Sequence, residues 1–468
     1  MPPLFATIVF GFAIWGLFFL GRDRKARVSK ALWIPVIWLS ISGSRMVSQW
    51  LSATALYKAH PSLNAVEQPL DGSPFDRNLL LCLIALAVIV LIERRHLVIR
   101  VVRANGPILL FLLYCAASIV WSDYPSVAFK RWTKAIGDLA MVLIVVTDAN
   151  PMAAVKRLLT RTGFLLLPLS ILLIKYFPHI GVGYRSYSSF PTYMGVTTSK
   201  TELGGISLLF GIASAWQFVE CLQDKRDPRR TQRLAAHGAL VVMSLFLIWR
   251  ANTVTALMCF LMAGSLIAAT SFSRFARKPS VVHLMVVGML CVSFTALFLG
   301  VGAGLVELVG RDSTLTGRTG VWHLILGMAP NHFLGTGFES FWLGPRLAKI
   351  YHVYWWHPNE AHNGYIEVFL DLGWVGLAFL GLVLVTGYRN VIRAFRQDRD
   401  AGRLRLAYFV VAVVYNFTES ATRIMHPVWI LFLLAIVAVP GGWVQRKAKK
   451  KTVDRPAFSA LPPCLEEV

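Results

Sequence analysis

The chain has 468 residues, of which 56% are hydrophobic and 15% are charged, and its mean hydropathy is +0.58. No soluble globular domain of this length has such a composition. The formal net charge is +23, from 47 basic and 24 acidic residues. That charge alone would suit a nucleic-acid-binding protein, but its distribution along the chain argues against that class.

Apolar stretches long enough to cross a hydrocarbon core of about 30 Å recur along the whole chain. They lie near residues 3–20, 31–56, 78–92, 105–121, 135–147, 162–177, 203–220, 235–249, 252–271, 282–306, 362–387, 404–418 and 426–442. Several are short, so we expect about 11–13 transmembrane helices. In lipid only helices satisfy their own backbone hydrogen bonds at this hydrophobicity, so the sequence predicts an all-α polytopic membrane protein.

The basic residues are concentrated in alternate loops between these stretches. One set of loops carries 32 of the 47 Lys and Arg residues, and the opposite set carries 13. The basic set comprises Arg22–Lys30, Arg94–Arg103, Lys156–Arg161, Lys225–Arg233, Arg274–Lys278, Arg389–Arg405 and Arg446–Arg455. This is the positive-inside bias, which places the basic loops in the cytoplasm and explains the net charge without nucleic acid.

The same bias predicts the organisation of the chain. We expect a transmembrane bundle at 1–306, with an outer loop at 178–202, and a large outer loop at 307–361. Transmembrane helices at 362–442 and a basic cytoplasmic tail at 443–468 follow. Residues 1–20 lack a basic start and a small-residue cleavage site, so the first stretch is predicted to be a retained span.

Two arginines stand in Gly-rich outer segments. Arg185 follows Gly181-Val182-Gly183-Tyr184 and precedes Gly195-Val196-Thr197-Thr198-Ser199-Lys200, and Arg318 opens Arg318-Thr319-Gly320-Val321-Trp322. A planar guanidinium suits the oxygens of a phosphate. Either arginine alone is as well explained by snorkelling or loop capping. Because both lie outside, against the charge bias, the pattern favours anion binding.

The loop at 307–361 is rich in histidine and aromatic residues. Its histidines are His323, His332, His352 and His357, with His362 next along the chain. Their spacings match no HExxH or comparable pattern, so no metal site is predicted. Its aromatic residues suit an interfacial belt or sugar-stacking platforms equally well, and they are Trp322, Phe338, Phe341, Trp342, Tyr351, Tyr354, Trp355 and Trp356.

His362 begins the apolar helix that follows this loop, where free backbone N–H groups favour an anion. Imidazole is also the side chain best suited to accept a hydroxyl proton near neutral pH. Asn363, Glu367 and Asp371 are four residues apart and share one face of the helix. Carboxylates within a span are costly, so these residues either join helices together or orient the residues at the helix head.

The order of these motifs resembles a known family. Arg185, Gly317-Arg318…Trp322, Pro330…Gly335-Thr336-Gly337 and His362-Asn363…Gly373…Gly376 together resemble the O-antigen ligase / Wzy-type polymerase superfamily. Within it, Trp121-Ser122-Asp123-Tyr124-Pro125…Arg131 and Ser44-Arg45…Ser48-Gln49-Trp50-Leu51 resemble the exopolysaccharide-production polymerase branch. The resemblance covers most of the chain and is strongest over 310–380.

This resemblance implies a GT-C-like transmembrane glycosyltransferase of the bacterial inner membrane that needs neither nucleotide sugars nor a metal or other cofactor. Such an enzyme takes a glycan from undecaprenyl diphosphate on the periplasmic face and passes it to an acceptor hydroxyl. Arg185 and Arg318 would hold the diphosphate, and His362 would activate or position the hydroxyl. The remaining expected substrate contacts are Asn363, Lys200, Arg131, Trp322, Gly335 and Gly337.

Polymerisation of lipid-linked repeat units is the activity that we expect. The partners implied are the lipid-linked oligosaccharide, membrane lipids and other polysaccharide assembly proteins. An O-antigen ligase that transfers the glycan to lipid A core is the first alternative. A lipid-linked oligosaccharide transporter is the second, but Arg45 and Lys175, the best intramembrane charges, both lie near span ends, and we find no repeated halves.

Overall fold

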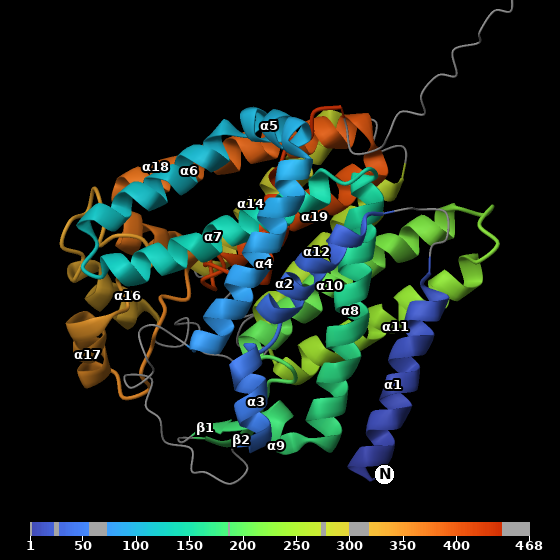
Figure 1. Cartoon of the computed structure of the whole chain (residues 1–468), viewed down its shortest axis with the longest axis horizontal. Coiled ribbons are helices and arrows are strands. Elements are labelled where there is room, and N and C mark those ends of the chain that lie inside the picture. The colour runs from blue at the N-terminus through green and yellow to red at the C-terminus, as the bar shows by residue number, and fades with distance from the viewer. Residues whose placement is uncertain are drawn as a thin grey trace, which may run out of the picture.

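A computed structural model of the chain describes residues 2–22, 28–55, 73–185, 188–272, 278–298 and 318–441 (Figure 1). The predicted cytoplasmic tail and residues 307–317 of the large outer loop lie outside these ranges. The elements are α1 (Pro3–Leu20), η1 (Lys30–Leu32), α2 (Trp33–Ser42), α3 (Val47–Ala55), α4 (Pro74–Glu93), α5 (Arg95–Ala104), α6 (Gly106–Ala117), η4 (Ser118–Trp121), α7 (Pro125–Val146), α8 (Pro151–Tyr176), α9 (Pro178–Gly181), β1 (Val182–Arg185), β2 (Ser188–Tyr193), α10 (Lys200–Gln223), α11 (Arg230–Ala251), α12 (Val254–Ser271), α14 (Pro279–Phe298), α16 (Arg318–Gly327), α17 (Gly344–Val353), α18 (Gly364–Gln397), α19 (Arg399–Tyr415) and α20 (Pro427–Ile436).

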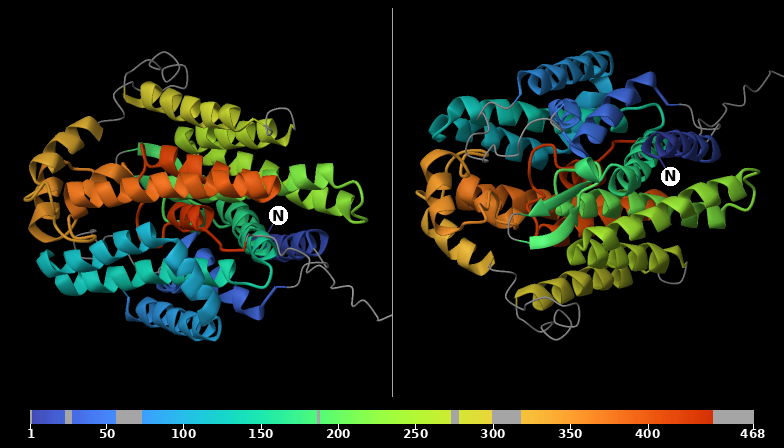
Figure 2. Two further views of the ribbon diagram at one scale, coloured as in Figure 1. Left: turned by 90° about the horizontal axis from the view of Figure 1, so that it is seen from above. Right: turned by 90° about the horizontal axis from the view of Figure 1, so that it is seen from below.

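The centre of the bundle is built around α10, which packs against α8, α11, α12 and α19. Within the most apolar window of α10, 72% of the residues are buried, against 11% in α1 and 17% in α4. The apolar side chains that α1 and α4 leave exposed are those that a lipid bilayer would cover. Figure 2 shows α18 between a group formed by α4 to α7 and a group formed by α11, α12 and α14.

The prediction of an all-α polytopic membrane protein is confirmed. In the described residues, seven helices are long and apolar enough to cross a membrane, and α5 with α6 and η4 forms an eighth candidate that is bent by 88°. Three shorter apolar helices bring the candidate segments to eleven, at the low end of the expected range. The chain is therefore a multi-pass membrane protein.

α18 is broken at Gly373, whose backbone angles are φ 64° and ψ −164°. This left-handed conformation is open to glycine at little cost. A side chain at this position would also collide with the backbone of the loop before α17, because a Cβ would lie 2.2 Å from the Phe333 carbonyl oxygen. The helix thus bends where another segment touches it.

The loop at 331–337 satisfies the backbone groups that this break leaves free. The amides of Thr336 and Gly337 donate to the carbonyls of Leu370 and Asp371, at 3.0 and 2.9 Å. Beyond the break, the amide of Trp374 donates to a carbonyl of the same loop at 2.9 Å. A broken helix at membrane depth needs such partners, so the loop and α18 form one unit.

A short β-hairpin is the only sheet in the described part of the chain. β1 and β2 are antiparallel, with Val182 opposite Tyr193 and Gly183 opposite Thr192. Arg45, in the turn between α2 and α3, donates hydrogen bonds to the carbonyls of Gly195 and Ile180, at 3.1 and 2.7 Å. The segment at 178–202 is therefore tied to the end of α2, beyond which Arg45 lies.

Candidate active site

The head of α18 is fixed by Asn363. Its Oδ1 accepts hydrogen bonds from the amides of Tyr365 and Ile366, at 3.0 and 3.1 Å, as a helix N-cap does. Its Nδ2 donates to the carbonyl of Phe417 at 3.2 Å. The start of α18 is thereby attached to the segment that joins α19 to α20. With both amide atoms engaged, Asn363 acts as a cap, and its contact with substrate stays a prediction.

His362 precedes this cap and has the left-handed backbone conformation, with φ 51°. A residue other than glycine pays about 1–2 kcal/mol for that conformation. Four of the five such residues that the structure describes lie in the segments around His362, and they are Glu339, His357, His362 and Met425. Strain of this kind is concentrated at functional sites and favours a functional role for this region.

Two carboxylates flank the imidazole of His362. Its Nδ1 lies 2.9 Å from Oε1 of Glu360 and 3.3 Å from Oε2 of Glu419. Burial lowers the pKa of His362, but the hydrogen bonds and negative charges of Glu360 and Glu419 outweigh burial and raise the pKa to about 9. The imidazole is therefore protonated near neutral pH.

Glu419 also joins His362 to Arg318. The Nη2 atom of Arg318 lies 3.3 Å from Oε1 of Glu419, and Nη1 donates to the carbonyl of Thr418. The two residues that the sequence singled out, 44 positions apart, thus meet on opposite oxygens of one carboxylate. Only 10% of the Glu419 side chain is exposed, so its two ion pairs are little screened by water.

A second ion pair completes the cluster. Nη1 of Arg423 lies 2.6 Å from Oε2 of Glu360. Burial raises the pKa of Glu360, but the hydrogen bond from His362 and the charge of Arg423 lower it to about 2. The five residues Arg318, Glu360, His362, Glu419 and Arg423, here called the His362 cluster, therefore alternate positive and negative charges.

Glu367, one turn into α18, holds the two chain segments that carry His362 and Glu419. Its Oε1 accepts from the amide of Ala361 at 2.5 Å and from the hydroxyl of Ser420 at 3.0 Å. Its Oε2 accepts from Nε1 of Trp342 at 2.7 Å. Ala361 and Ser420 are the neighbours of His362 and Glu419. Of the two readings open for this carboxylate, orientation of the helix head is the one that these contacts support.

Asp371 performs a similar task one turn further on. Its Oδ1 accepts from the amides of Ser340 and Phe341, both at 3.0 Å. Gly335 and Gly337 lie in the same loop with φ 71° and 93°. A Cβ at Gly335 would lie 2.4 Å from the backbone of Asp371, and one at Gly337 would lie 2.6 Å from Cβ of Ser122. The close approach that these glycines permit is to protein, and contact with substrate stays a prediction.

Atoms of Glu360, His362 and Glu419 lie within 4.8 Å of one another, which is close enough to hold a metal ion. The histidines of the outer loop do not converge in this way: His357 stacks on Tyr351 at 4.4 Å between ring centres. Arg423 and Arg318 each occupy one oxygen of the two carboxylates, so charge balance is reached without a cation. Metal independence stays a prediction, and Glu360, His362 and Glu419 are the ligands that a metal would use if the prediction is wrong.

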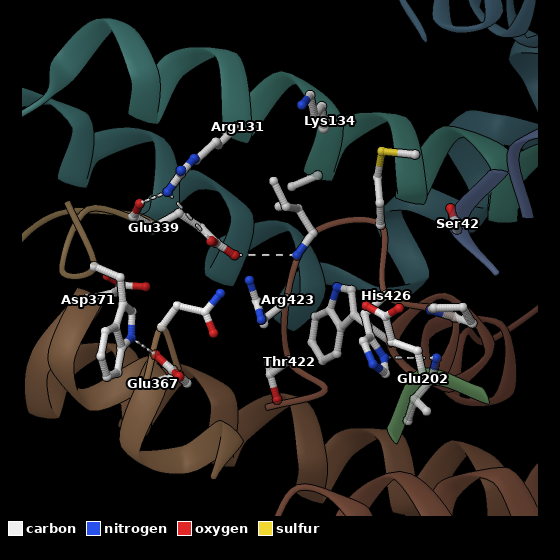
Figure 3. A pocket seen from close by; sticks show the side chains of 18 of the residues that line it. Ser42, Arg131, Lys134, Glu202, Glu339, Glu367, Asp371, Thr422, Arg423 and His426 are labelled. Carbon is white, nitrogen blue, oxygen red and sulfur yellow. Dashed lines mark hydrogen bonds and ion pairs between the residues drawn. The ribbon is translucent and has the colours of Figure 1, made fainter. Parts of the chain in front are cut away.

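A cavity of about 660 Å³ adjoins the cluster, and Arg423 lines it (Figure 3). Its lining residues come from α2, α7, α10, α18 and α20, among other elements, and from the loop predicted to be outside at 307–361. Thr198 of the 178–202 loop and Trp342 of the 307–361 loop both lie in its lining. The two outer loops therefore lie at the same end of the bundle.

The other predicted contacts are spread around this region. Arg131 lines the cavity and donates to the carbonyl of Glu339. Trp322 donates to the carbonyl of Ala361 at 2.7 Å, which supports the His362 segment from behind. Lys200 is the first residue of α10 and is not among the lining residues of the cavity. The backbone of Arg185 ends β1, and the position of its side chain lies outside the described part.

Glu360, Glu419 and Arg423 are the residues that sequence reasoning missed. Glu419 and Arg423 lie in the short segment after α19, which the charge pattern had placed outside but which carries no motif. A carboxylate between two apolar helices, on the side predicted for His362, is the only signal that could have directed attention to Glu419, and no motif accompanies it. Glu360 is two residues before His362 and stands in a loop rich in polar groups, where nothing distinguished it.

Comparison with known proteins gives two matches. The family model described as O-antigen ligase matches residues 231–381, which include Arg318 and His362 but not Glu419. The exopolysaccharide production protein ExoQ of Rhizobium meliloti (strain 1021) is 25% identical over 301 residues. The match covers 62% of this chain and 66% of that protein, just under two thirds of its length. The stretch matched by the family model holds Arg318, Glu360 and His362 of the His362 cluster, and over it the chain is similar to O-antigen ligases and, through ExoQ, to an exopolysaccharide production protein.

Proposed function

We propose that the protein is a membrane glycosyltransferase that polymerises undecaprenyl-diphosphate-linked repeat units of an exopolysaccharide or O-antigen on the periplasmic face of the inner membrane. The observation that carries the proposal is the bridge by which Glu419 holds Arg318 and His362 together at the head of α18. Cationic groups gathered on an outer surface suit a reaction whose leaving group is a lipid diphosphate.

In the proposed reaction, the oxygen of an acceptor hydroxyl forms a bond to the anomeric carbon of the donor glycan. The bond from that carbon to the diphosphate breaks, and undecaprenyl diphosphate leaves with the electron pair. Direct displacement inverts the anomeric centre. Arg318, with Arg185 as its predicted partner, stabilises the negative charge that builds on the diphosphate.

His362 and Glu419 divide the remaining tasks. Because the pKa of His362 is raised to about 9, its imidazole carries a proton near neutral pH and cannot accept another. We therefore assign it to positioning and to charge stabilisation. The hydroxyl proton goes to the carboxylate of Glu419, the acidic group that contacts both Arg318 and His362. No step of the reaction assigned in this way is given to a metal.

Two features support the proposed location of the reaction. Both outer loops line one cavity, so a single site can contain residues from both. The basic loops, which the positive-inside bias places in the cytoplasm, are at the other ends of the helices. A site on the side opposite to these loops faces the periplasm, where a lipid-linked glycan meets its acceptor.

Polymerase is favoured over ligase by the match to an exopolysaccharide production protein, which covers the larger part of this chain. Ligation of an O-antigen to lipid A core is the second candidate, and the matched family model supports it. A transporter is disfavoured because the charged cluster lies at the ends of helices rather than at mid-membrane.

Deletion of the gene, followed by separation of surface, secreted and lipid-linked glycans by size, tests the function. Single repeat units on the carrier would indicate a polymerase, and full-length chains left on the carrier would indicate a ligase. Complementation with His362→Ala should fail although the variant inserts at normal abundance. Purified protein in liposomes that moves a lipid-linked glycan without lengthening it would refute the transferase proposal.

A further inference from the structure

The cavity beside the His362 cluster is polarised. Arg131 and Lys134, three residues apart on α7, form one wall, and Glu367 and Asp371 of α18 lie across from them (Figure 3). Arg423 stands between the two walls. A volume of about 660 Å³ lies within the range of small-molecule sites, which is about 300–1,000 Å³.

The carboxylates of this cavity are already engaged with protein donors. Glu367 and Asp371 accept from the groups described above, and Glu202 accepts from the amide and hydroxyl of Thr198, at 3.1 and 2.7 Å. Glu339 accepts from the amide of Ile424 at 3.4 Å. These contacts hold the acidic wall in place and leave further lone pairs on the oxygens for hydroxyl donors.

The cationic wall is less completely paired. Nη1 of Arg131 donates to the carbonyl of Glu339, but it lies 4.0 Å from Oε2 of that residue, at the limit of an ion pair. None of the residues that the structure describes forms a hydrogen bond or an ion pair with Lys134, which is half-buried in the cavity wall, although the negative charges of Asp76 and Glu339 act on it from a greater distance. A half-buried ammonium without a direct hydrogen bond or ion pair is costly, so a ligand that brings an anionic group into contact with it would be favoured.

We infer that this cavity binds the saccharide portion of a substrate glycan, and that Lys134 and Arg131 hold an acidic substituent of that saccharide, such as a uronate carboxylate. This inference rests on the proposed function. Sugar hydroxyls would bridge the donors of α7 and the carboxylates of α18. Trp342, Tyr351 and Trp429 in the lining supply the aromatic surfaces against which sugar rings pack. Arg423, shared with the His362 cluster, connects the cavity to the reaction.

The test uses the purified full-length chain in lipid nanodiscs and measures dissociation constants for three probes. They are a glucuronate-containing disaccharide, the glucose-containing disaccharide of the same linkage, and inorganic diphosphate. We expect the acidic disaccharide to bind at least about tenfold more tightly than the neutral one. Lys134→Met should remove that preference, and Lys134→Arg should keep it. Lys130→Met is the matched control, because Lys130 is on the same helix and does not line the cavity.

An unchanged preference in Lys134→Met overturns the inference. So does binding of diphosphate alone through Lys134, because that result would assign the cationic wall to the lipid diphosphate. Failure of this inference and failure of the proposed function are distinguishable. If His362→Ala abolishes transfer while Lys134→Met keeps the preference, the function stands and the cavity assignment falls. If the preference depends on Lys134 but His362→Ala still polymerises, the cavity assignment stands and the proposed role of His362 in the function falls.

Discussion

Replacement of Glu419 by Gln removes one negative charge from the His362 cluster and nearly preserves its shape. The pKa of His362 rises from 6.5 to about 9 in the folded protein, which corresponds to about 3.4 kcal/mol in favour of the imidazolium. The side chain of His362 is 36% exposed, so solvent screening makes the effective energy smaller. Glu360 and Glu419 share this effect, at 2.9 and 3.3 Å. We therefore expect Glu419→Gln to lower the pKa of His362 by about one pH unit.

The assay is magnetic resonance of the full chain in nanodiscs with isotope-labelled histidine, titrated from about pH 6 to pH 10 to follow the imidazole. His362→Gln identifies the signal by its loss. Glu93→Gln is the control, because Glu93 is an exposed carboxylate at the far end of α4. If the pKa of His362 is the same in Glu419→Gln as in the control, the contact does not set its protonation. Glycan transfer by Glu419→Gln should fall by about 10²–10⁴-fold if the carboxylate accepts the hydroxyl proton.

Four further predictions concern charge, metal, pH and topology. Arg318→Lys should lose transfer almost as fully as Arg318→Ala, because an ammonium cannot reproduce bidentate phosphate contacts; full activity with Lys would reduce Arg318 to a general positive charge. Transfer should persist in EDTA. If EDTA abolishes transfer and one added divalent ion restores it, the His362 cluster holds a metal. Transfer should be steady near neutral pH and fall as the pH rises through about 9, because His362 then loses its proton; a rise of activity toward that pH would make the neutral imidazole the base. The side chains of Phe190 and Lys349 are exposed on the two segments predicted to be outside, so Phe190→Cys and Lys349→Cys should each react with an impermeant thiol reagent in intact spheroplasts. Gln397→Cys should react only after lysis. If Phe190→Cys and Lys349→Cys react from opposite sides of the membrane, residues of the two segments cannot form one site.

The raised pKa of His362 also affects stability, and the direction follows from linkage. A group whose pKa is higher in the folded state stabilises the fold fully below its unfolded value of 6.5. That contribution is lost as the pH rises through about 9. Glu360 acts in the opposite direction: its pKa is lowered to about 2, so its contribution is present above its ordinary value of 4.5 and is lost as the pH falls toward 2.

The sequence predicted the helices well because hydropathy and span length depend on local composition alone. Arg318 and His362 could also be predicted from the sequence, since each stands beside glycine or at the edge of an apolar stretch. Glu419, which contacts both, could not be predicted. Glu419 lies 57 residues beyond His362, and the two meet only because α18 and α19 run antiparallel and return the chain to the same end of the bundle. No local sequence pattern predicts a contact between residues so far apart in the chain.

The glycines illustrate a different limit. Gly335 and Gly337 were predicted to contact substrate, but a missing Cβ does not say which group approaches a glycine. In the structure, it is the backbone of Asp371 and the side chain of Ser122. Gly373 was noted only as part of a motif, since one glycine inside an apolar stretch is ordinary in a membrane helix. The break of α18 at Gly373 could be recognised only from the structure, which shows the contact with the loop at 331–337.

The break in α18 has a consequence for the biogenesis of the protein. Residues 331–337 leave the ribosome before α18 does. The carbonyls of Leu370 and Asp371 then meet the amides of Thr336 and Gly337 as soon as the helix arrives. The order of synthesis therefore supplies the loop before the helix that depends on it. A rearranged gene that encodes the loop after α18 would leave those carbonyls without these partners until the loop is made, and unpaired backbone groups are costly in lipid.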